Sequence, residues 1–125
     1  MPIQKKPGKP RKPFPVMLMD EARKELFAMD AEDRAAFISA IDDFELYGPG
    51  HRMVDTEKIS GDLFELKAQS SSHWLRGFYF HYLDGLYVIS HIFAKKTNKT
   101  PKSNRELGLA RYMVFKDRMA KLSGT

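Results

Sequence analysis

The sequence predicts an α+β fold in which a helical hairpin comes first, a small antiparallel-rich sheet follows, and a single helix closes the chain. Apolar residues recur at helical spacing up to about residue 47 and alternate with period two from about residue 54. Asp84-Gly85 then separates two apolar runs, which is a strong signal for a β-hairpin. A chain of 125 residues has the length of one domain with a substantial core.

Short signals mark the first three elements. Residues 14–19 are apolar and are expected to form the first strand. Asp20 is expected to cap a helix over residues 21–29, and Asp30 is expected to cap a second helix that runs to about Tyr47. Glycine and proline directly after Tyr47 end this second helix. The two helices therefore form an acidic hairpin with one apolar face.

The apolar face of the second helix should be part of the core. Its large apolar residues recur at i, i+1, i+4 and i+7, which places them in one stripe. The acids of this helix, Asp33 among them, are expected to face away from it. The residues of the stripe are Phe37, Ile38, Ile41 and Phe44.

Four strands are expected after the hairpin, over residues 54–59, 63–68, 74–83 and 87–94. The last two should pair antiparallel. Because side chains alternate between the faces of a strand, the basic residues can be sorted by face. Lys95 is expected to share its face with Tyr87.

The closing helix is expected over about residues 105–122. Ser103 and Glu106 have the spacing of a capping box, in which the two side chains satisfy free backbone donors at a helix start. An apolar stripe on this helix should pack on the sheet. Its residues are Leu107, Ala110, Met113 and Val114.

The charge is distributed unevenly along the chain. Residues 1–13 carry five Lys/Arg and no acid, and their alternating prolines predict a disordered basic arm ahead of one domain over 14–125. Residues 14–66 carry thirteen Asp/Glu against five Lys/Arg, whereas residues 67–102 carry six Lys/Arg and a single acid. A basic half of this kind favours a polyanionic partner, of which nucleic acid is the commonest.

Composition also excludes several classes of site. The chain has no cysteine, which rules out a disulfide frame, a thiolate nucleophile and a cysteine zinc site. Its four histidines lack the close helical pairing of many metal sites, so we expect no metal and no cofactor. No apolar run approaches the roughly 20 residues of a membrane-spanning helix, and we expect a cytoplasmic protein without a membrane partner.

Lysine, arginine, histidine and tyrosine on a sheet suit metal-independent cleavage of RNA. The ribose 2′-hydroxyl must lose a proton, negative charge builds on the phosphate, and the 5′-oxygen must leave protonated. A lysine of lowered pKa or a histidine can act as base, and arginine can stabilise the phosphate with a planar fork of donors. The stretch 92–101 fits this chemistry, since an apolar strand ends there in three lysines followed by proline.

Three segments resemble the phage-derived RelE/HigB-like toxins of type II toxin–antitoxin systems. They read LFELK at 63–67, WLRGFYF at 74–80 and HIFAKKTNKTP at 91–101. The corresponding family patterns are L-x-E-L-R, Y-R-x-x-Y and H-x-F-x-K-K-T-x-K-T-P. The resemblance implies the compact RelE-like fold and an mRNA interferase that often acts on ribosome-bound mRNA. It also implies a helix-turn-helix antitoxin as partner.

The resemblance also implies roles for individual residues. The catalytic set would be Lys67, Arg76, His91, Lys95 and Lys96, with Arg76 and Lys67 stabilising the phosphate. Lys67 stands where the family pattern has arginine, which keeps the charge but loses the bidentate fork. Residues expected to contact RNA are Tyr79, Lys99, Arg111 and Arg118. Two alternatives stay open: a non-catalytic RNA- or ribosome-binding module on the same fold, and a regulatory protein-interaction domain.

Overall fold

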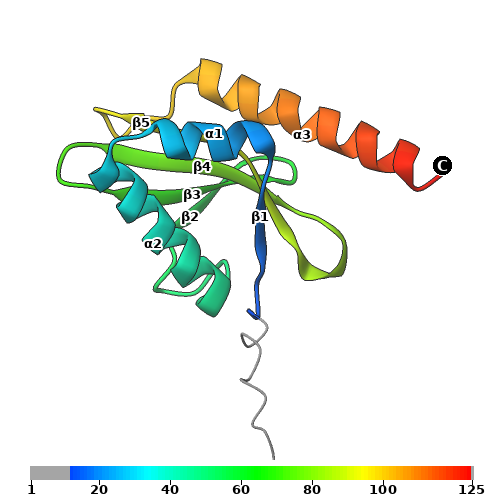
Figure 1. Ribbon diagram of the computed structural model, residues 1–125, viewed down its shortest axis with the longest axis horizontal. Coiled ribbons are helices and arrows are strands. Elements are labelled where there is room, and N and C mark those ends of the chain that lie inside the picture. Colours follow the sequence, from blue (N-terminus) through cyan, green and yellow to red (C-terminus); the bar gives the residue numbers. More distant parts are fainter. Residues whose placement is uncertain (1–11, 125) are drawn as a thin grey trace, which may run out of the picture.

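The computed structural model describes residues 12–124, apart from the side chain of Asp84, as a five-stranded mixed sheet with three α-helices (Figure 1). This confirms the predicted α+β class and the predicted order of elements. In chain order the elements are β1 (Val16–Leu18), α1 (Asp20–Ala28), α2 (Ala31–Tyr47), β2 (Thr56–Ser60), β3 (Leu63–Gln69), β4 (Trp74–His81), the 3-10 turn η1 (Leu83–Gly85), β5 (Tyr87–Lys95) and α3 (Lys102–Leu122).

The strands are ordered β1-β5-β4-β3-β2 across the sheet. β1 runs parallel to β5, and the other neighbours are antiparallel, as predicted for the β4–β5 pair. The connection between β4 and β5 is longer than the two-residue Asp-Gly turn. It includes η1 and is closed by a 2.6 Å hydrogen bond from the Tyr82 amide to the Leu86 carbonyl.

A bulge in β5 corrects one predicted face. Phe78 pairs with His91, but the next residue, Tyr79, pairs with Ile89, so one residue of β5 has no partner in the register. An extra residue in a strand reverses the faces beyond it. Tyr87 consequently lies on the face opposite to Lys95, and the expectation that these two share a face is wrong.

Helices α2 and α3 cover opposite faces of the sheet (Figure 1). Gly77 of β4 faces α2, where a Cβ atom would overlap the ring of Phe37. The next residue, Phe78, faces α3 and closely approaches Gly108, which is buried in that helix. The absence of a side chain at each contact lets a helix approach the sheet closely, because a Cβ atom there would meet an aromatic ring.

Two of the three predicted helix caps differ from the structure. Asp30 caps α2 as expected, since its Oδ1 accepts from the Asp33 amide at 2.9 Å. Asp20 is instead the first residue of α1, because Met19 precedes the helix and donates its amide to Ile89, which extends the ladder of β1. Ser103 lies inside α3, which begins earlier than predicted, directly after Pro101.

Two acids of α2 are buried, although they were expected to face away from the core. Asp33 is 3% exposed and accepts from the Ser70 hydroxyl at 2.5 Å. Glu45 is 7% exposed and accepts from the Val16 amide at 3.0 Å and from Lys12 at 2.7 Å. The two carboxylates thus attach α2 to the β3–β4 turn and to β1.

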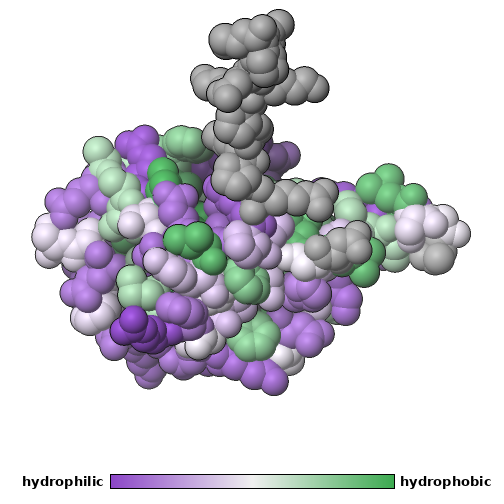
Figure 2. Space-filling model, turned by 90° about the horizontal axis from the view of Figure 1, so that it is seen from below, coloured by the Kyte–Doolittle hydropathy of each residue, from purple (hydrophilic) through white to green (hydrophobic). Residues whose placement is uncertain are grey.

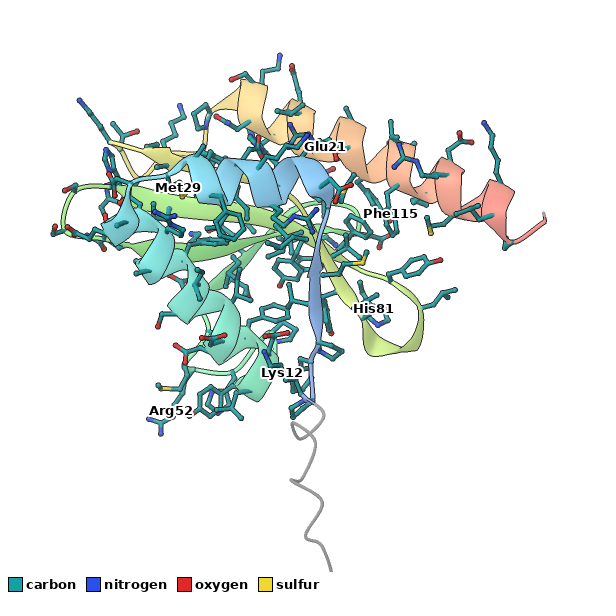
Figure 3. The ribbon with its side chains drawn as sticks, in the orientation of Figure 1. Lys12, Glu21, Met29, Arg52, His81 and Phe115 are labelled. Atoms are coloured by element: carbon teal, nitrogen blue, oxygen red, sulfur yellow. The ribbon has the colours of Figure 1, made fainter. Side chains whose placement is uncertain are left out.

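Lys12 lies at the foot of β1, near the end of α2 (Figure 3). It belongs to the predicted basic arm, yet it forms the ion pair with Glu45. Residues 1–11 lie outside the described part of the chain, and so does most of the predicted arm.

The predicted apolar stripe of α3 is wrong. Leu107, Met113 and Val114 are exposed, whereas Gly108, Tyr112 and Phe115 are buried. The helix is rotated because two aromatic rings fill more space against the sheet than the aliphatic residues do. Phe80 lies 4.3 Å from Tyr112 and 5.2 Å from Phe115, measured between ring centroids. Phe115 accordingly points from α3 towards the β4–β5 hairpin (Figure 3).

The core lies on both faces of the sheet, and on α2 the predicted stripe contributes Phe37 and Phe44, while Ile38 remains 38% exposed. The face seen from below in Figure 2 is mostly hydrophilic, with hydrophobic residues in separate small areas. Within the described residues, no helix is both long enough and apolar enough to cross a membrane.

The close approach of Gly108 to Phe78 can be tested with Gly108→Ala. Overpacking should lower the free energy of unfolding by about 1–3 kcal/mol, even though a helix interior favours alanine over glycine by about 1 kcal/mol. Urea denaturation measures the change. In a Phe78→Leu background the new methyl group meets a smaller side chain, so the same substitution should cost less. An equal cost in both backgrounds would show that the contact with Phe78 is not the cause.

Candidate active site

Three residues of the predicted catalytic set lie together on one face of the sheet. Lys67 of β3 is the cross-strand partner of Arg76 of β4, and Trp74 of β4 is the partner of Lys95 at the end of β5. The loop between β5 and α3, residues 96–101, adjoins this cluster. Alternation along the three strands accounts for the grouping, because residues at paired positions point to the same face.

Arg76 is the largest fully buried residue of the site, with a side chain that is 2% exposed. Its Nε lies 3.3 Å from Glu65 Oε1, an ion pair that is not aligned as a hydrogen bond. One terminal nitrogen donates to the Leu75 carbonyl at 2.9 Å, and the other donates to the side-chain oxygen of Asn98. Burial lowers the pKa of Arg76, and the carboxylate of Glu65 opposes this effect.

The loop after β5 is held to the sheet by polar contacts. Lys95 Nζ donates to the Asn98 carbonyl at 2.9 Å and to Thr100 Oγ1 at 3.1 Å. The Thr100 hydroxyl donates in turn to Glu65 Oε1 at 2.5 Å. Asn98 therefore contacts both Arg76 and Lys95, and Glu65 contacts both Arg76 and Thr100.

Two hollows flank Asn98. One lies between the start of β4 and the end of β3, with Arg76 in its lining, and the other lies between β2 and the loop, with Lys99 in its lining. Lys67 lines both of them, and its Nζ donates to Glu57 at 2.5 Å. This hydrogen bond lowers the pKa of Glu57. Lys95 adjoins the hollows through its contacts with Asn98 and Thr100. We call the two hollows together with Lys95 the Lys67–Lys95 cleft.

The amine of Lys95 can act as a base near neutral pH. Its partial burial, together with the nearby charges of Arg76 and Lys67, lowers its pKa to about 8, although Glu65 acts in the opposite direction. With such a pKa, about a tenth of the amines are neutral at pH 7. Neutral amines can accept a proton, whereas an ordinary lysine is almost fully protonated at that pH.

His91 lies away from the Lys67–Lys95 cleft. Lys95 is four positions further along β5, which corresponds to about 13 Å along a strand. It is 4% exposed, and its two ring nitrogens contact Glu25 at 2.9 Å and Asn104 at 2.8 Å. Burial alone would raise the pKa of Glu25, but hydrogen bonds from His91, Arg111 and a backbone amide lower it. His91 therefore takes part in a cluster that joins α1, β5 and α3.

The residues expected to bind RNA lie in different places. Tyr79 is in the core on the opposite face, where its ring centroid is 4.9 Å from that of Phe44 and burial raises its pKa to about 12. Arg111 donates to Glu25 at 2.8 Å within the His91 cluster. Neither lines the cleft, and contact of either residue with RNA stays a prediction. Lys96, Lys99 and Arg118 are exposed, the first two in the loop and the third on α3.

The predicted set of site residues left out three residues of the cleft, namely Glu65, Asn98 and Thr100. Asn98 and Thr100 are interspersed with the lysines of the motif at 91–101, and Glu65 shares a face with Lys67 by alternation. These positions were visible in the sequence. Their partners were not, because the path of the loop over the sheet cannot be deduced from a motif.

One group of side chains outside the cleft has the composition of a metal site. Asp30, Asp33 and His73 each offer a ligand atom, and these atoms lie within 4.8 Å of one another. Each acid already has a structural partner, because Asp30 caps α2 and Asp33 accepts from Ser70. We assign no metal to this group, and the absence of a metal cofactor stays a prediction.

A sequence profile of the phage-derived Gp49-like proteins matches residues 24–113, which is more than half of the chain. The chain belongs to this family. The match spans α1 to α3 and includes every residue of the Lys67–Lys95 cleft. No curated protein matches the chain.

Among solved structures, this Gp49-like protein is similar to an archaeal RelE from Pyrococcus horikoshii OT3, determined as a RelE–RelB complex. The TM-score is 0.52 at 18% sequence identity, and the match covers 70% of this chain and 99% of the other. At this identity the likeness shows the fold, which is that of RelE. The family and the fold together confirm the resemblance to RelE-like toxins.

The lowered pKa of Lys95 can be measured directly in the Gp49-like protein. NMR titration of the Lys95 side chain should give a midpoint near pH 8, because burial and two neighbouring cations disfavour the ammonium. Lys67→Gln removes one of those cations and should move the midpoint upwards. A Lys95 midpoint at the ordinary value of about 10.4 would contradict the proposed burial of the amine.

Proposed function

We propose that this Gp49-like protein is the toxin of a type II toxin–antitoxin system and cleaves RNA without a metal at the Lys67–Lys95 cleft. The observation that carries the proposal is the Lys95 amine, which Asn98 and Thr100 hold at the end of β5 and which has a pKa of about 8 because of its partial burial and the nearby charges of Arg76 and Lys67. RNA cleavage needs a base near neutral pH and cations at the phosphate, and this cleft contains both.

In the proposed reaction, the 2′-oxygen attacks the adjacent phosphorus while the neutral Lys95 amine accepts the hydroxyl proton. A P–O bond to the 2′-oxygen forms, the P–O bond to the 5′-oxygen breaks, and a 2′,3′-cyclic phosphate results. The 5′-oxygen receives a proton from an exposed lysine of the loop, Lys96 or Lys99. Lys67 and Arg76 stabilise the negative charge on the phosphate.

Arg76 can bind a phosphate only if the side chain of Asn98 moves away from it. The side-chain oxygen of Asn98 accepts from a terminal nitrogen of Arg76, where a phosphate oxygen would otherwise bind. We propose that the Asn98 side chain occupies this position until RNA binds. Rotation of one side chain is enough, because the backbone carbonyl of Asn98 can keep its contact with Lys95.

The proposed partners follow from the same family. The archaeal RelE of similar fold was determined with RelB, and we propose a helix-turn-helix antitoxin as the partner of this chain. We propose mRNA, bound at the ribosome, as the substrate and the cytoplasm as the location. Lys99 and Arg118, which are exposed, are proposed to contact RNA outside the cleft.

One observation favours a second function, an RNA- or ribosome-binding module without cleavage. Both terminal nitrogens of Arg76 already donate to protein oxygens. If Asn98 stayed in place when RNA bound, Arg76 would only support the loop and the remaining lysines would bind phosphates. Cleavage would then be absent while salt-dependent binding remained.

Cleavage with chelator present tests the proposed chemistry. Purified protein, incubated with RNA or with translating ribosomes in EDTA, should leave 2′,3′-cyclic phosphate or 3′-phosphate ends, because the attacking group is the 2′-oxygen of the RNA itself. End-specific ligation and mass spectrometry identify the products. Activity that disappears in EDTA and returns with added divalent metal would indicate a different mechanism, and binding without cleavage would support the module.

Arg76→Ala tests whether Arg76 acts on the reaction. Its loss should slow single-turnover cleavage by roughly 100-fold or more, on the order of 3 kcal/mol as for other preorganised donors. Affinity for RNA should fall far less, since Lys67 and the loop lysines remain. Arg76→Lys should recover little, because an ammonium cannot donate two parallel hydrogen bonds.

The burial of Arg76 requires a control for folding. Because Glu65 would lose its buried partner, Arg76→Ala should also lower the melting temperature. Cleavage should therefore be expressed per folded molecule, and Glu65→Gln serves as a second variant that weakens the same pair and keeps the guanidinium. A destabilised Arg76→Ala protein with wild-type cleavage per folded molecule would show that Arg76 only supports the fold.

A further inference from the structure

The amine of Lys95 is held by the loop that follows it. An ammonium has three N–H donors, and two of those of Lys95 are used by the loop, one by the Asn98 carbonyl at 2.9 Å and one by Thr100 Oγ1 at 3.1 Å. Both acceptors come within five residues of Lys95 in the chain. A short loop thus turns back and holds the side chain of the last strand residue between two acceptors. We call this pair of hydrogen bonds the bracket.

The hydrogen bond of Thr100 has a fixed direction. Its hydroxyl lies 2.5 Å from Glu65 Oε1, and an ionised carboxylate can only accept, so the hydroxyl donates to Glu65. The oxygen of Thr100 is then left as acceptor for Lys95. The Glu65 side chain is 3% exposed and also lies 3.3 Å from Arg76 Nε. A buried carboxylate therefore sets the orientation of the threonine hydroxyl.

We propose that Thr100 is a positioning residue that holds the Lys95 amine in the Lys67–Lys95 cleft, with Glu65 orienting its hydroxyl. The inference rests on the proposed function for the role of Lys95 in the reaction, but the bracket itself is a property of the free protein. Thr100 touches neither the phosphate nor the 2′-oxygen in this scheme. It acts only through Lys95.

The physical reason is that an unbracketed lysine would leave the cleft. The four-carbon stem of lysine is flexible, and an ammonium is strongly hydrated, so a free Lys95 would move its head into water. The groups that face the amine are Arg76 from β4, Glu65 and Lys67 from β3, and the ring of Phe93 from its own strand. Arg76 and Lys67 favour the neutral amine and Glu65 favours the ammonium. If the amine moved away from these groups, its pKa would rise towards that of an ordinary lysine.

Thr100→Val tests the bracket, because valine keeps the shape of threonine and lacks the hydroxyl. At pH 7 the single-turnover rate at saturating RNA should fall by about 10-fold, as expected when a base loses its fixed position, with RNA affinity within about 2-fold of wild type. The rising limb of the pH–rate profile should move to higher pH. Thr100→Ser restores the hydroxyl and should restore both the rate and the position of the limb.

Two controls separate positioning from a general effect on the loop. Thr97→Val makes the same chemical change at an exposed threonine three residues earlier and should leave rate and profile unchanged. Melting temperatures identify any variant that unfolds, and Thr100→Ala replaces Thr100→Val in that case. A Thr100→Val limb that stays in place or moves down, or a Thr100→Ser variant as slow as Thr100→Val, would overturn the proposal.

The bracket can also be tested without any cleavage. NMR titration of Lys95 in the free protein should give a higher midpoint in Thr100→Val than in wild type, and Thr100→Ser should return it to the wild-type value. If the wild-type protein does not cleave RNA but this shift occurs, the proposed function fails and the positioning role of Thr100 stands. Equal midpoints in wild type and Thr100→Val would overturn the positioning role whatever the activity.

Discussion

The buried pair of Arg76 and Glu65 is the interaction on which the rest of the cleft depends. A guanidinium that is 2% exposed loses its hydration, and this cost is offset only if its donors find partners inside the protein. Glu65 supplies the opposite charge, the carbonyl of Leu75 and the side chain of Asn98 supply acceptors, and Thr100 shares the carboxylate. Breaking the pair would therefore disturb both the sheet and the loop.

This arrangement explains why the loop after β5 has a defined path although it contains no regular structure. Asn98 is fixed by Arg76, Thr100 is fixed by Glu65, and Lys95 contacts both of them. The loop then ends at Pro101, which precedes α3 in an extended conformation with a φ of −65°. Cations at the end of one strand are thus placed over neighbouring strands by two short polar side chains.

The basic residues divide into two groups with different consequences. Arg111 and His91 join α1, β5 and α3 around Glu25, and Lys12 attaches β1 to α2 through Glu45. These contacts hold the fold. Lys67 and Lys99 line hollows at the surface, Lys95 contacts Asn98 and Thr100 beside them, and Lys96 is exposed. These are the cations placed to meet a polyanion. The number of cations available to bind RNA is therefore smaller than the number of basic residues in the sequence suggests.

The sequence alone was enough for the fold class, the element order and the antiparallel pairing of β4 with β5. Periodicity and turn signals carry that information, because they depend on neighbours along the chain. The bulge in β5 was not predictable because the pattern of apolar residues carries no mark of the extra residue. The rotation of α3 was not predictable because it depends on how Phe78 meets Gly108 and how Phe80 meets two rings of that helix. The contact of Arg76 with Asn98 was missed for the same reason, because the two residues are 22 positions apart in the chain.

The central claim is that the scissile phosphate of RNA binds between Arg76 and Lys95. A crystal structure with an RNA oligonucleotide that carries 2′-O-methyl groups, and so cannot react, tests it most directly. We predict a phosphate within hydrogen-bond distance of a terminal nitrogen of Arg76, with the side chain of Asn98 rotated away and the blocked 2′-oxygen beside Lys95. RNA bound on the surface with Asn98 still on Arg76, or phosphates bound only along α3, would contradict the claim.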